Sequence, residues 1–171
     1  MPFIIFSAYD YFEEWFKKFK PDFYIVVSPD FSELFDAIEK CLEHNFNTDE
    51  INLKIKQEEI GSLYNLGLAH HEINEYDEAL QAFRGAVKIK PDHAKAFYGI
   101  GNIHMKLARH TEAIEAFKQA ILFDNNFEGA HFNLGLSYLA LGQKSKALEE
   151  YKILQKINAK LAEELFNEIY K

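Results

Sequence analysis

The chain has only one cysteine, Cys41, only four prolines, and no concentration of positive charge. A single cysteine excludes an internal disulfide, which fits a reducing compartment; a secreted protein without disulfides is the alternative. Acidic residues outnumber lysine and arginine by 27 to 19, so the formal net charge is −8, and no basic cluster is interleaved with aromatic residues. This balance disfavours nucleic acid and anionic membrane surfaces as partners.

Long apolar runs are missing too. No stretch reaches the roughly 18 apolar residues that a membrane-spanning helix needs. The apolar start, residues 1–6, has no basic beginning and is soon followed by Asp10, so it does not match a signal peptide. We therefore expect a soluble, cytoplasmic protein without membrane insertion.

What the sequence does contain is an internal repeat. From residue 60 to residue 161 one pattern returns three times at a spacing of 34 residues, without a gap. Small residues recur at the eighth, twentieth and usually the twenty-seventh positions, and large apolar residues at the fourth, seventh and twenty-fourth. The aligned sets are Leu63, Leu66, Gly67, His70, Ala79, Phe83, Ala86 and Pro91; Phe97, Ile100, Gly101, His104, Ala113, Phe117, Ala120 and Asn125; and His131, Leu134, Gly135, Tyr138, Ala147, Tyr151, Leu154 and Ala159.

Each unit predicts two amphipathic helices, because its apolar residues recur at steps of three and four. A glycine inside the first helix costs about 1 kcal/mol relative to alanine, so we expect a close approach of the partner helix at Gly67, Gly101 and Gly135. Small residues on the second helix would then let large aromatic residues fill the space between units. The alanines are Ala79, Ala113 and Ala147, and the aromatic residues are Phe83, Phe117 and Tyr151.

The connections carry their own signals. Asp77, Thr111 and Ser145 share one repeat position and are predicted to cap the second helices, and Asp92 is predicted to cap the helix that follows Pro91.

The turns inside the units differ in composition. Asn74 and Gly142 suit a left-handed backbone where the first helix turns back, whereas Ala108 does not. We therefore expect the turn at Ala108 to be less regular than the other two.

This 34-residue pattern resembles the tetratricopeptide repeat (TPR) family. The resemblance implies an all-α fold, a right-handed superhelix of stacked helix pairs with units at residues 60–93, 94–127 and 128–161. After the third unit, Leu161, Leu165, Phe166 and Ile169 fall on one helical face. Residues 162–171 thus resemble the terminal capping helix of such arrays.

Residues 1–59 do not continue the repeat and are predicted to form a helical, aromatic-rich extension. Twelve of the chain's 26 aromatic residues lie among the first 35, too many to leave in water. We expect helices at about 8–19 and 31–44, with Cys41 as a buried thiol. Residues 3–6 and 23–27 have strand composition, and an extended linker is the alternative.

The end of the extension is predicted to be irregular. Residues 45–50 indicate a turn, with Thr48 or Asp49 as a helix cap. Ile51, Leu53 and Ile55 alternate with polar residues, which leaves a strand or irregular structure open before the first unit.

In the TPR family the first helices line a concave groove, and the resemblance implies which residues would line it here. The fifth repeat position holds aromatic residues, and the sixth and ninth hold several asparagines whose amides can pair with a peptide backbone. The predicted binding residues are Tyr64, Asn65, Leu68, His71, Lys95, Tyr98, Asn102, Met105, Phe132, Asn133 and Leu136.

The same resemblance disfavours one known kind of ligand. TPR arrays that bind chaperone C-terminal carboxylates use a clamp of lysine, asparagine and arginine. The clamp positions hold Tyr64, Leu68, Gly99, Gly129 and Asn133 here. We therefore expect a mostly apolar peptide or helix of a protein partner rather than a chaperone tail.

The sequence predicts neither catalysis nor metal binding. The sequence has no glycine-rich phosphate loop, nucleophile elbow or paired cysteines. His70 and His71 point about 100° apart if they lie on a helix, and His104 lies a whole repeat away, so one ion cannot join them. We predict no catalytic residues, no metal and no cofactor.

The resulting hypothesis is a non-enzymatic adaptor or scaffold that binds a partner segment in the groove. One alternative is a self-assembling scaffold, a homo-oligomer in which the aromatic N-terminal segment docks into a neighbouring molecule. Another is an enzyme whose catalytic part lies in residues 1–59 or outside this sequence.

Overall fold

The computed structural model describes the backbone of residues 31–171 and the side chains of residues 50–171. The described part is all helical and contains no strand, which confirms the all-α prediction. Contacts separate the chain into two units that meet at Asp49 and Glu50, and the second unit holds the repeats. The helices are α2 (Phe31–Glu72), α3 (Tyr76–Ile89), α4 (Ala94–Lys106), α5 (His110–Phe123), α6 (Glu128–Ala140), α7 (Lys144–Ile157) and α8 (Ala159–Ile169).

Some predictions lie outside the described residues. They are the helix at about 8–19, the strand-like segments at 3–6 and 23–27, and the burial of the Cys41 side chain. Within the described chain, no helix is both long and apolar enough to cross a membrane.

Helix α2 corrects the prediction for the end of the extension. It is continuous from Phe31 to Glu72, so the expected turn at residues 45–50, the caps Thr48 and Asp49, and the strand or irregular alternative at residues 51–55 are wrong. The chain has no proline or glycine between Phe31 and residue 60. Asparagine and threonine each cost a helix less than about 0.7 kcal/mol, which does not end it. The predicted helix at 31–44 is therefore the first part of a longer one.

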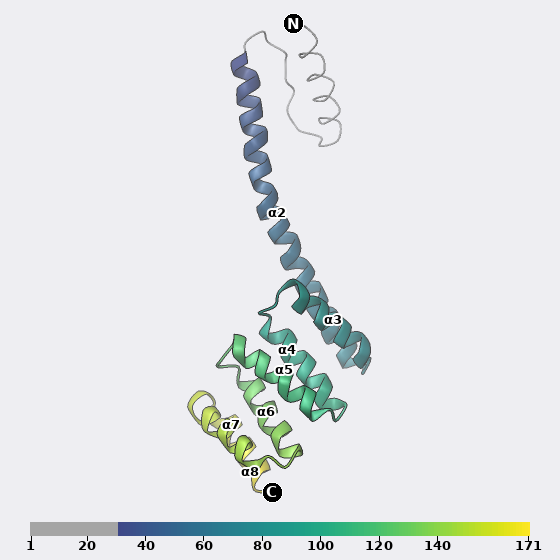
Figure 1. The fold of residues 1–171 in the computed structure, drawn as a ribbon, viewed down its shortest axis with the longest axis vertical. Coiled ribbons are helices and arrows are strands. Elements are labelled where there is room, and N and C mark those ends of the chain that lie inside the picture. The colour runs from purple at the N-terminus through teal and green to yellow at the C-terminus, as the bar shows by residue number, and fades with distance from the viewer. Residues whose placement is uncertain (1–30) are drawn as a thin grey trace. The chain divides into compact units, whose positions relative to one another are not determined.

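From α3 to α8 the helices follow one another as antiparallel hairpins stacked side by side (Figure 1). Each helix packs mainly on its neighbours in the sequence. Alternate helices also approach each other, since α4 contacts α6 and α6 contacts α8. The first helices of the three units, the end of α2 with α4 and α6, therefore form one layer and the second helices another.

Glycines let the aromatic residues pack between the units, as predicted. A Cβ atom on Gly67 would lie 2.7 Å from the ring of Phe83, and one on Gly99 would lie 2.6 Å from the same ring. A Cβ atom on Gly101 would overlap Phe117 in the same way. Phe83 and Phe117 are fully buried. Close approach at these glycines offsets their cost to the helix.

The third joint differs from the prediction. The residue that faces Gly135 is Leu165 of α8, 2.6 Å from the position of a Cβ atom, and not Tyr151. Tyr151 is only half-buried and packs on Phe166, with 5.3 Å between the ring centroids. Tyr151 therefore packs between α7 and α8, but at Gly135 the close contact comes from Leu165 and not from Tyr151.

The physical reason is a shorter connection to α8. The residues that precede α4 and α6, His93 and Phe127, are 34 positions apart, whereas Phe127 and Asn158, which precedes α8, are 31 apart. Helix α8 is therefore three residues out of the repeat register and begins at Ala159 rather than at residue 162. This shift gives Phe166 the place that Gly135 has in α6.

The capping face of α8 is partly as predicted. Leu165 and Ile169 are buried and Leu161 is half-buried, whereas Phe166 is 40% exposed. The shifted register explains why Phe166 is excluded from the core.

The three turns inside the units are identical in backbone conformation. Asn74, Ala108 and Gly142 all have positive φ angles, of 62°, 55° and 70°. Each turn is closed by a backbone hydrogen bond that spans five residues, for example from the Arg109 amide to the His104 carbonyl at 2.8 Å. This is the usual left-handed end of a helix. The expectation of a less regular turn at Ala108 is therefore wrong.

Replacing Ala108 with glycine should stabilise the protein by about 0.5–1 kcal/mol. The left-handed conformation costs alanine roughly 1–2 kcal/mol, and the extra freedom of glycine in the unfolded chain offsets only part of that gain. Denaturant unfolding measures the difference. Gly142→Ala is the matched control and should lower stability by a similar amount; a stabilising Gly142→Ala would contradict the explanation.

The predicted helix caps are also corrected. The residues that precede α3, α5 and α7 are Glu75, Arg109 and Gln143, and none makes a side-chain cap bond. Each follows directly on a left-handed turn residue, so the predicted caps lie two residues further on, inside the first helical turn. These wrongly predicted residues are Asp77, Thr111 and Ser145.

The first helices begin differently. His93 rather than Asp92 caps α4, with its Nδ1 accepting from the Ala96 amide at 3.3 Å. Asn158 caps α8 in the same way by accepting from the Leu161 amide at 3.1 Å.

Candidate functional site

The predicted binding residues lie on the first helices of the three units. Asn65, Leu68 and Lys95 are exposed and the others are half-buried. We call this set the first-helix face. It comprises Tyr64, Asn65, Leu68 and His71 of α2; Lys95, Tyr98, Asn102 and Met105 of α4; and Phe132, Asn133 and Leu136 of α6.

Three of these side chains form one hydrogen-bonded cluster. The Asn133 Nδ2 donates to the Asn102 Oδ1 at 2.7 Å and to the Tyr98 hydroxyl at 3.2 Å. The cluster joins α4 to α6 across the second and third units. Because amide and hydroxyl groups that are tied together lose rotational freedom, their remaining polar atoms are held in fixed directions.

The two tyrosines of the face also belong to the packing of the array. The Tyr64 ring lies 5.7 Å from Phe83 and is stacked on His93 at 5.3 Å, between centroids. Burial, and then the nearby Tyr98, raise the pKa of Tyr64, so its hydroxyl stays protonated near neutral pH. Tyr98 also packs on buried phenylalanine, with its centroid 5.8 Å from that of Phe117. Each tyrosine therefore presents only part of its ring to a ligand.

The structure explains why two clamp positions carry glycine. A Cβ atom on Gly99 would lie 2.6 Å from the Phe83 ring, and one on Gly129 would lie 3.0 Å from the Tyr98 hydroxyl. A side chain at Gly99 would have to displace the buried Phe83 ring, whereas a side chain at Gly129 would require the Tyr98 hydroxyl to move by a few tenths of an ångström. The packing therefore disfavours a clamp side chain at position 99.

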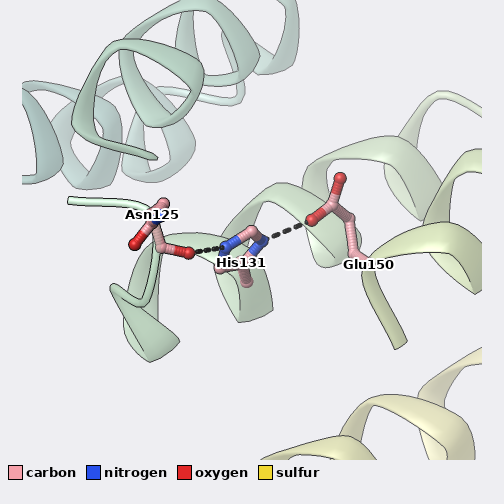
Figure 2. Close-up of polar contacts among 3 residues, drawn as sticks. All are labelled: Asn125, His131 and Glu150. Atoms are coloured by element: carbon pink, nitrogen blue, oxygen red, sulfur yellow. Dashed lines mark hydrogen bonds and ion pairs between the residues drawn. The ribbon is translucent and has the colours of Figure 1, made fainter. Parts of the chain in front are cut away.

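The sequence did not predict an ionic bridge in the third unit, centred on His131 (Figure 2). Its Nδ1 lies 2.7 Å from the Glu150 Oε2, and its Nε2 lies 3.1 Å from the carbonyl oxygen of Asn125. Both neighbours are acceptors, so both contacts are hydrogen bonds only when both ring nitrogens carry hydrogen, and the arrangement favours the protonated imidazolium. The bridge ties α6 to α7 and to the turn that precedes α6.

A signal for this bridge was present in the repeat columns. The fourth position holds apolar residues, Leu63 and Phe97, in the first two units and His131 in the third. Nineteen residues further on, the columns hold Ala82, Ala116 and Glu150. Two departures from the repeat occur together, and they contact each other. Paired departures from a repeat consensus are the feature that predicts such a contact.

The titration of His131 should follow from its two partners. Burial alone would lower the pKa of His131, but the hydrogen bonds with Glu150 and the Asn125 carbonyl outweigh it, and the pKa is raised. Imidazole NMR should therefore show His131 titrating above the ordinary value of about 6.5. Glu150→Gln should bring the midpoint down, whereas Glu149→Gln, which alters the adjacent exposed carboxylate, should leave it unchanged.

The raised pKa of His131 also determines how the bridge changes the stability of the fold with pH. Because the folded pKa of His131 is raised, its contribution is fully present below about pH 6.5 and is lost as the pH rises through the folded pKa. The pH dependence of unfolding should therefore be flatter for Glu150→Gln than for the native chain above pH 6.5. A His131 midpoint below 6.5 in the native chain would contradict the ionic bridge.

The histidines considered for a metal lie apart. His70 contacts the Glu75 carboxylate at 2.6 Å, within one turn. His104 is buried, which lowers its pKa, and its Nδ1 has no partner among the described residues. No group of three metal-binding side chains occurs in residues 50–171. His104 therefore belongs to the packing of the units, and His70 to the turn before α3.

A shallow hollow of about 240 Å³ lies between α7 and α8, away from the first-helix face. Two alanines, a tyrosine and a phenylalanine are among its lining residues. It is small and is formed by two helices only, so it is a weaker candidate than the first-helix face, which spans three helices. Its lining residues are Tyr151, Gln155, Ala159, Ala162, Glu163 and Phe166.

Comparison with known proteins shows the class to which this architecture belongs. The tetratricopeptide repeat family model matches residues 64–128 and, overlapping with them, residues 98–162. The matches cover more than half of the chain, so the chain belongs to the tetratricopeptide repeat family. No curated protein matches it.

Solved structures share the fold at low sequence identity. The chain is similar to the TPR domain of Arabidopsis OM64, with a TM-score of 0.64, 14% identity, and coverage of 67% of this chain and 97% of that one. It is also similar to the second TPR domain of human RPAP3, solved with the HSP70 peptide SGPTIEEVD. The TM-score is 0.64 and the identity 19%, with coverage of 68% of this chain and 98% of that one. A third similar structure is the TPR2B domain of yeast Sti1 in a pHsp70 complex. The TM-score is 0.62 and the identity 20%, with coverage of 66% of this chain and 97% of that one.

Proposed function

We propose that this protein is a non-enzymatic adaptor that binds a peptide segment of a partner protein on the first-helix face. The observation that carries the proposal is the combination of apolar side chains with a pre-oriented polar cluster on three adjacent helices. Among the apolar side chains, Leu68 is 39% exposed and Leu136 is half-buried. In the polar cluster, the Asn133 amide donates to both Tyr98 and Asn102. Apolar contact area with a few fixed polar groups is typical of binding surfaces.

The residues of the first-helix face favour an apolar partner segment over an acidic one. The HSP70 peptide of the similar human structure ends in the acidic run EEVD. Here the first-helix face carries one lysine, Lys95, and two clamp positions are glycines, of which Gly99 packs against the buried Phe83 ring. A partner with a mostly apolar segment fits this face better than an acidic tail. We also propose a cytoplasmic location, which fits the single cysteine.

Replacing the exposed Leu68 with glutamate should weaken binding of a peptide selected from a random library against the full chain by about tenfold or more. A charge in an apolar contact area must lose its water when the peptide binds, which costs more than 1.4 kcal/mol. Fluorescence anisotropy of the labelled peptide measures the affinity. Leu68 takes no part in the buried clusters of the array, so folding should be kept.

Leu122→Glu is the matched control. Leu122 is 70% exposed on α5, a second helix, and the substitution adds the same charge. It should leave the affinity unchanged. Equal losses in both variants, with equal helicity by circular dichroism, would show that charge and not the first-helix face governs binding. Selected peptides that bind both variants as tightly as the native chain would reject the proposed function.

A further inference from the structure

One face of α2 is exposed, although the equivalent faces of α4 and α6 are buried. Leu66 is 48% exposed, whereas its equivalents Ile100 and Leu134 are 9% and 3% exposed. Ser62 and Ala69 are exposed as well, whereas their equivalents in both later units are completely buried. We call this face of α2 the outer edge. It comprises Ser62, Leu66, Ala69 and Ile73, which the repeat relates to Ala96, Ile100, Ile103 and Leu107 and to Ala130, Leu134, Ser137 and Leu141.

The later units show what kind of element covers such a face. In the second unit it is the preceding second helix, α3, and α5 packs on α6 in the same way. The buried cluster between α3 and α4 includes Ala79, Leu80, Phe83 and Ala86 of α3 with Ala96, Ile100 and Ile103 of α4. The covering element is therefore an amphipathic helix that runs antiparallel to the first helix. The outer edge has the same spacing of three and four residues, so a helix of this kind fits it.

The outer edge is separate from the first-helix face. Leu66 and Leu68 are two positions apart, which places them about 160° from each other round α2. Terminal units of repeat arrays usually turn a polar face outward. Here a leucine and an isoleucine, Ile73 at 63% exposure, lie there with two small residues. An exposed apolar stripe of this kind marks an interaction surface.

The charges around the outer edge are acidic. Glu58 and Glu59 lie one turn before Ser62 and Glu72 lies at the other end, and all three glutamates are exposed. Lys56, the nearest lysine along α2, is six residues before Ser62 and therefore about 120° round the helix from it. A helix that lies antiparallel to α2 would end beside Glu58 and Glu59. Basic residues in its last turn are favoured there by these carboxylates and by its own dipole.

We propose that the outer edge binds an amphipathic helix of a partner protein, which lies antiparallel to α2 and carries basic residues in its last turn. This site is additional to the first-helix face and does not depend on it. A second copy of the chain fits less well, because its helices α3, α5 and α7 already bury their apolar faces within the array. Its terminal helix α8 would bring like charge to Glu58 and Glu59, which is unfavourable. The exposed glutamates of α8 are Glu163, Glu164 and Glu168.

The array itself supplies a probe for this site. The probe is a labelled peptide with the sequence of α3, Tyr76–Ile89, followed by three lysines. A cross-link between the positions of Asp77 and Gln81, which are exposed in α3, keeps it helical, because an isolated helix of this length is marginal in water. Fluorescence anisotropy with the full chain measures its affinity.

Leu66→Glu should lower the affinity for the probe by about tenfold or more, because the new charge loses its water when the helix covers it. Leu68→Glu is the matched control on the same helix and should change this affinity less than about twofold. The library-selected peptide of the proposed function should show the opposite pattern. The two sites therefore fail independently of each other, and equal losses of probe binding in both variants would overturn this inference alone.

Exchanging charges tests the chemistry of the partner helix. A probe that ends in three glutamates should bind the native chain about fivefold more weakly than the lysine probe, and Glu58→Lys with Glu59→Lys should reverse that order. Equal affinities for the two probes would overturn the inference. So would either other occupant of the edge. A second copy would appear as a dimer that Leu66→Glu dissociates in sedimentation, and coverage by residues 1–30 as a fall of several degrees in the unfolding midpoint of Leu66→Glu without probe.

Discussion

Replacing Phe117 with alanine should lower the free energy of unfolding by about 3–5 kcal/mol. Phe117 is fully buried between the second and third units, with its ring against Gly101 of α4 and against Tyr98. Removing the ring takes away its transfer free energy and leaves a cavity that rigid helices cannot close. The expected loss is a large part of the total stability of a domain of this size.

Urea unfolding followed by circular dichroism gives the free energy. Leu122→Ala is the control on the same helix, and because Leu122 is 70% exposed it should cost no more than about 0.5 kcal/mol. A loss below about 1 kcal/mol for Phe117→Ala would mean that the helices close over the vacated space. In that case the glycines at the joints would not reflect tight contact with the aromatic rings.

The second large effect concerns the ionic bridge of the third unit. His131→Phe should lower stability by about 3 kcal/mol, because it removes one partner of a buried ion pair and leaves the Glu150 carboxylate, whose side chain is only 12% exposed, without a cation. Adding Glu150→Ala to this variant should recover most of the loss. The double variant recreates the pair found in the second unit, Phe97 with Ala116.

The double-mutant cycle makes this test quantitative. Glu150→Ala alone should cost about 1.5–3 kcal/mol, the value of a hydrogen bond to a charged group, because His131 can then bury its neutral form. If the two single losses simply add in the double variant, His131 and Glu150 do not interact in solution. A coupling energy near zero would therefore contradict the bridge.

The repeat register predicted the helix pairs from the sequence because each unit obeys two independent rules at once. Apolar residues recur at helical steps, and small residues recur where two helices meet, so Gly67 and Phe83 could be matched before any coordinates. The same rule failed at Gly135, since the single-residue connection through Asn158 shifts α8 by three positions. The length of a connection depends on where one helix ends, and residue types alone do not determine that.

Errors at the helix ends have a different cause. Asn45 and Thr48 favour turns in isolation, but their cost inside a helix is a few tenths of a kcal/mol, which a long helix tolerates. Ala108 adopts the left-handed backbone of Asn74 and Gly142 because the packed helices on both sides require the same turn. In both cases the cooperative structure outweighs the preference of a single residue.

For the candidate site, too, the sequence predicted some features and only the structure showed others. The sequence placed the binding residues on the first helices, and their role in binding stays a prediction. It could not show that Asn133 connects Tyr98 to Asn102, because the distances between helices decide which side chains meet. That contact joins α4 to α6 on the first-helix face.

The most direct test of the proposed function is a methyl NMR spectrum of the full chain with and without a library-selected peptide. We expect the methyl resonances of Leu68, Met105 and Leu136 to shift, while those of Leu122 and Leu141 stay in place. Shifts confined to residues near Phe166 and Tyr170, at the exposed aromatic end of the array, would contradict the account and move the binding site away from the first helices.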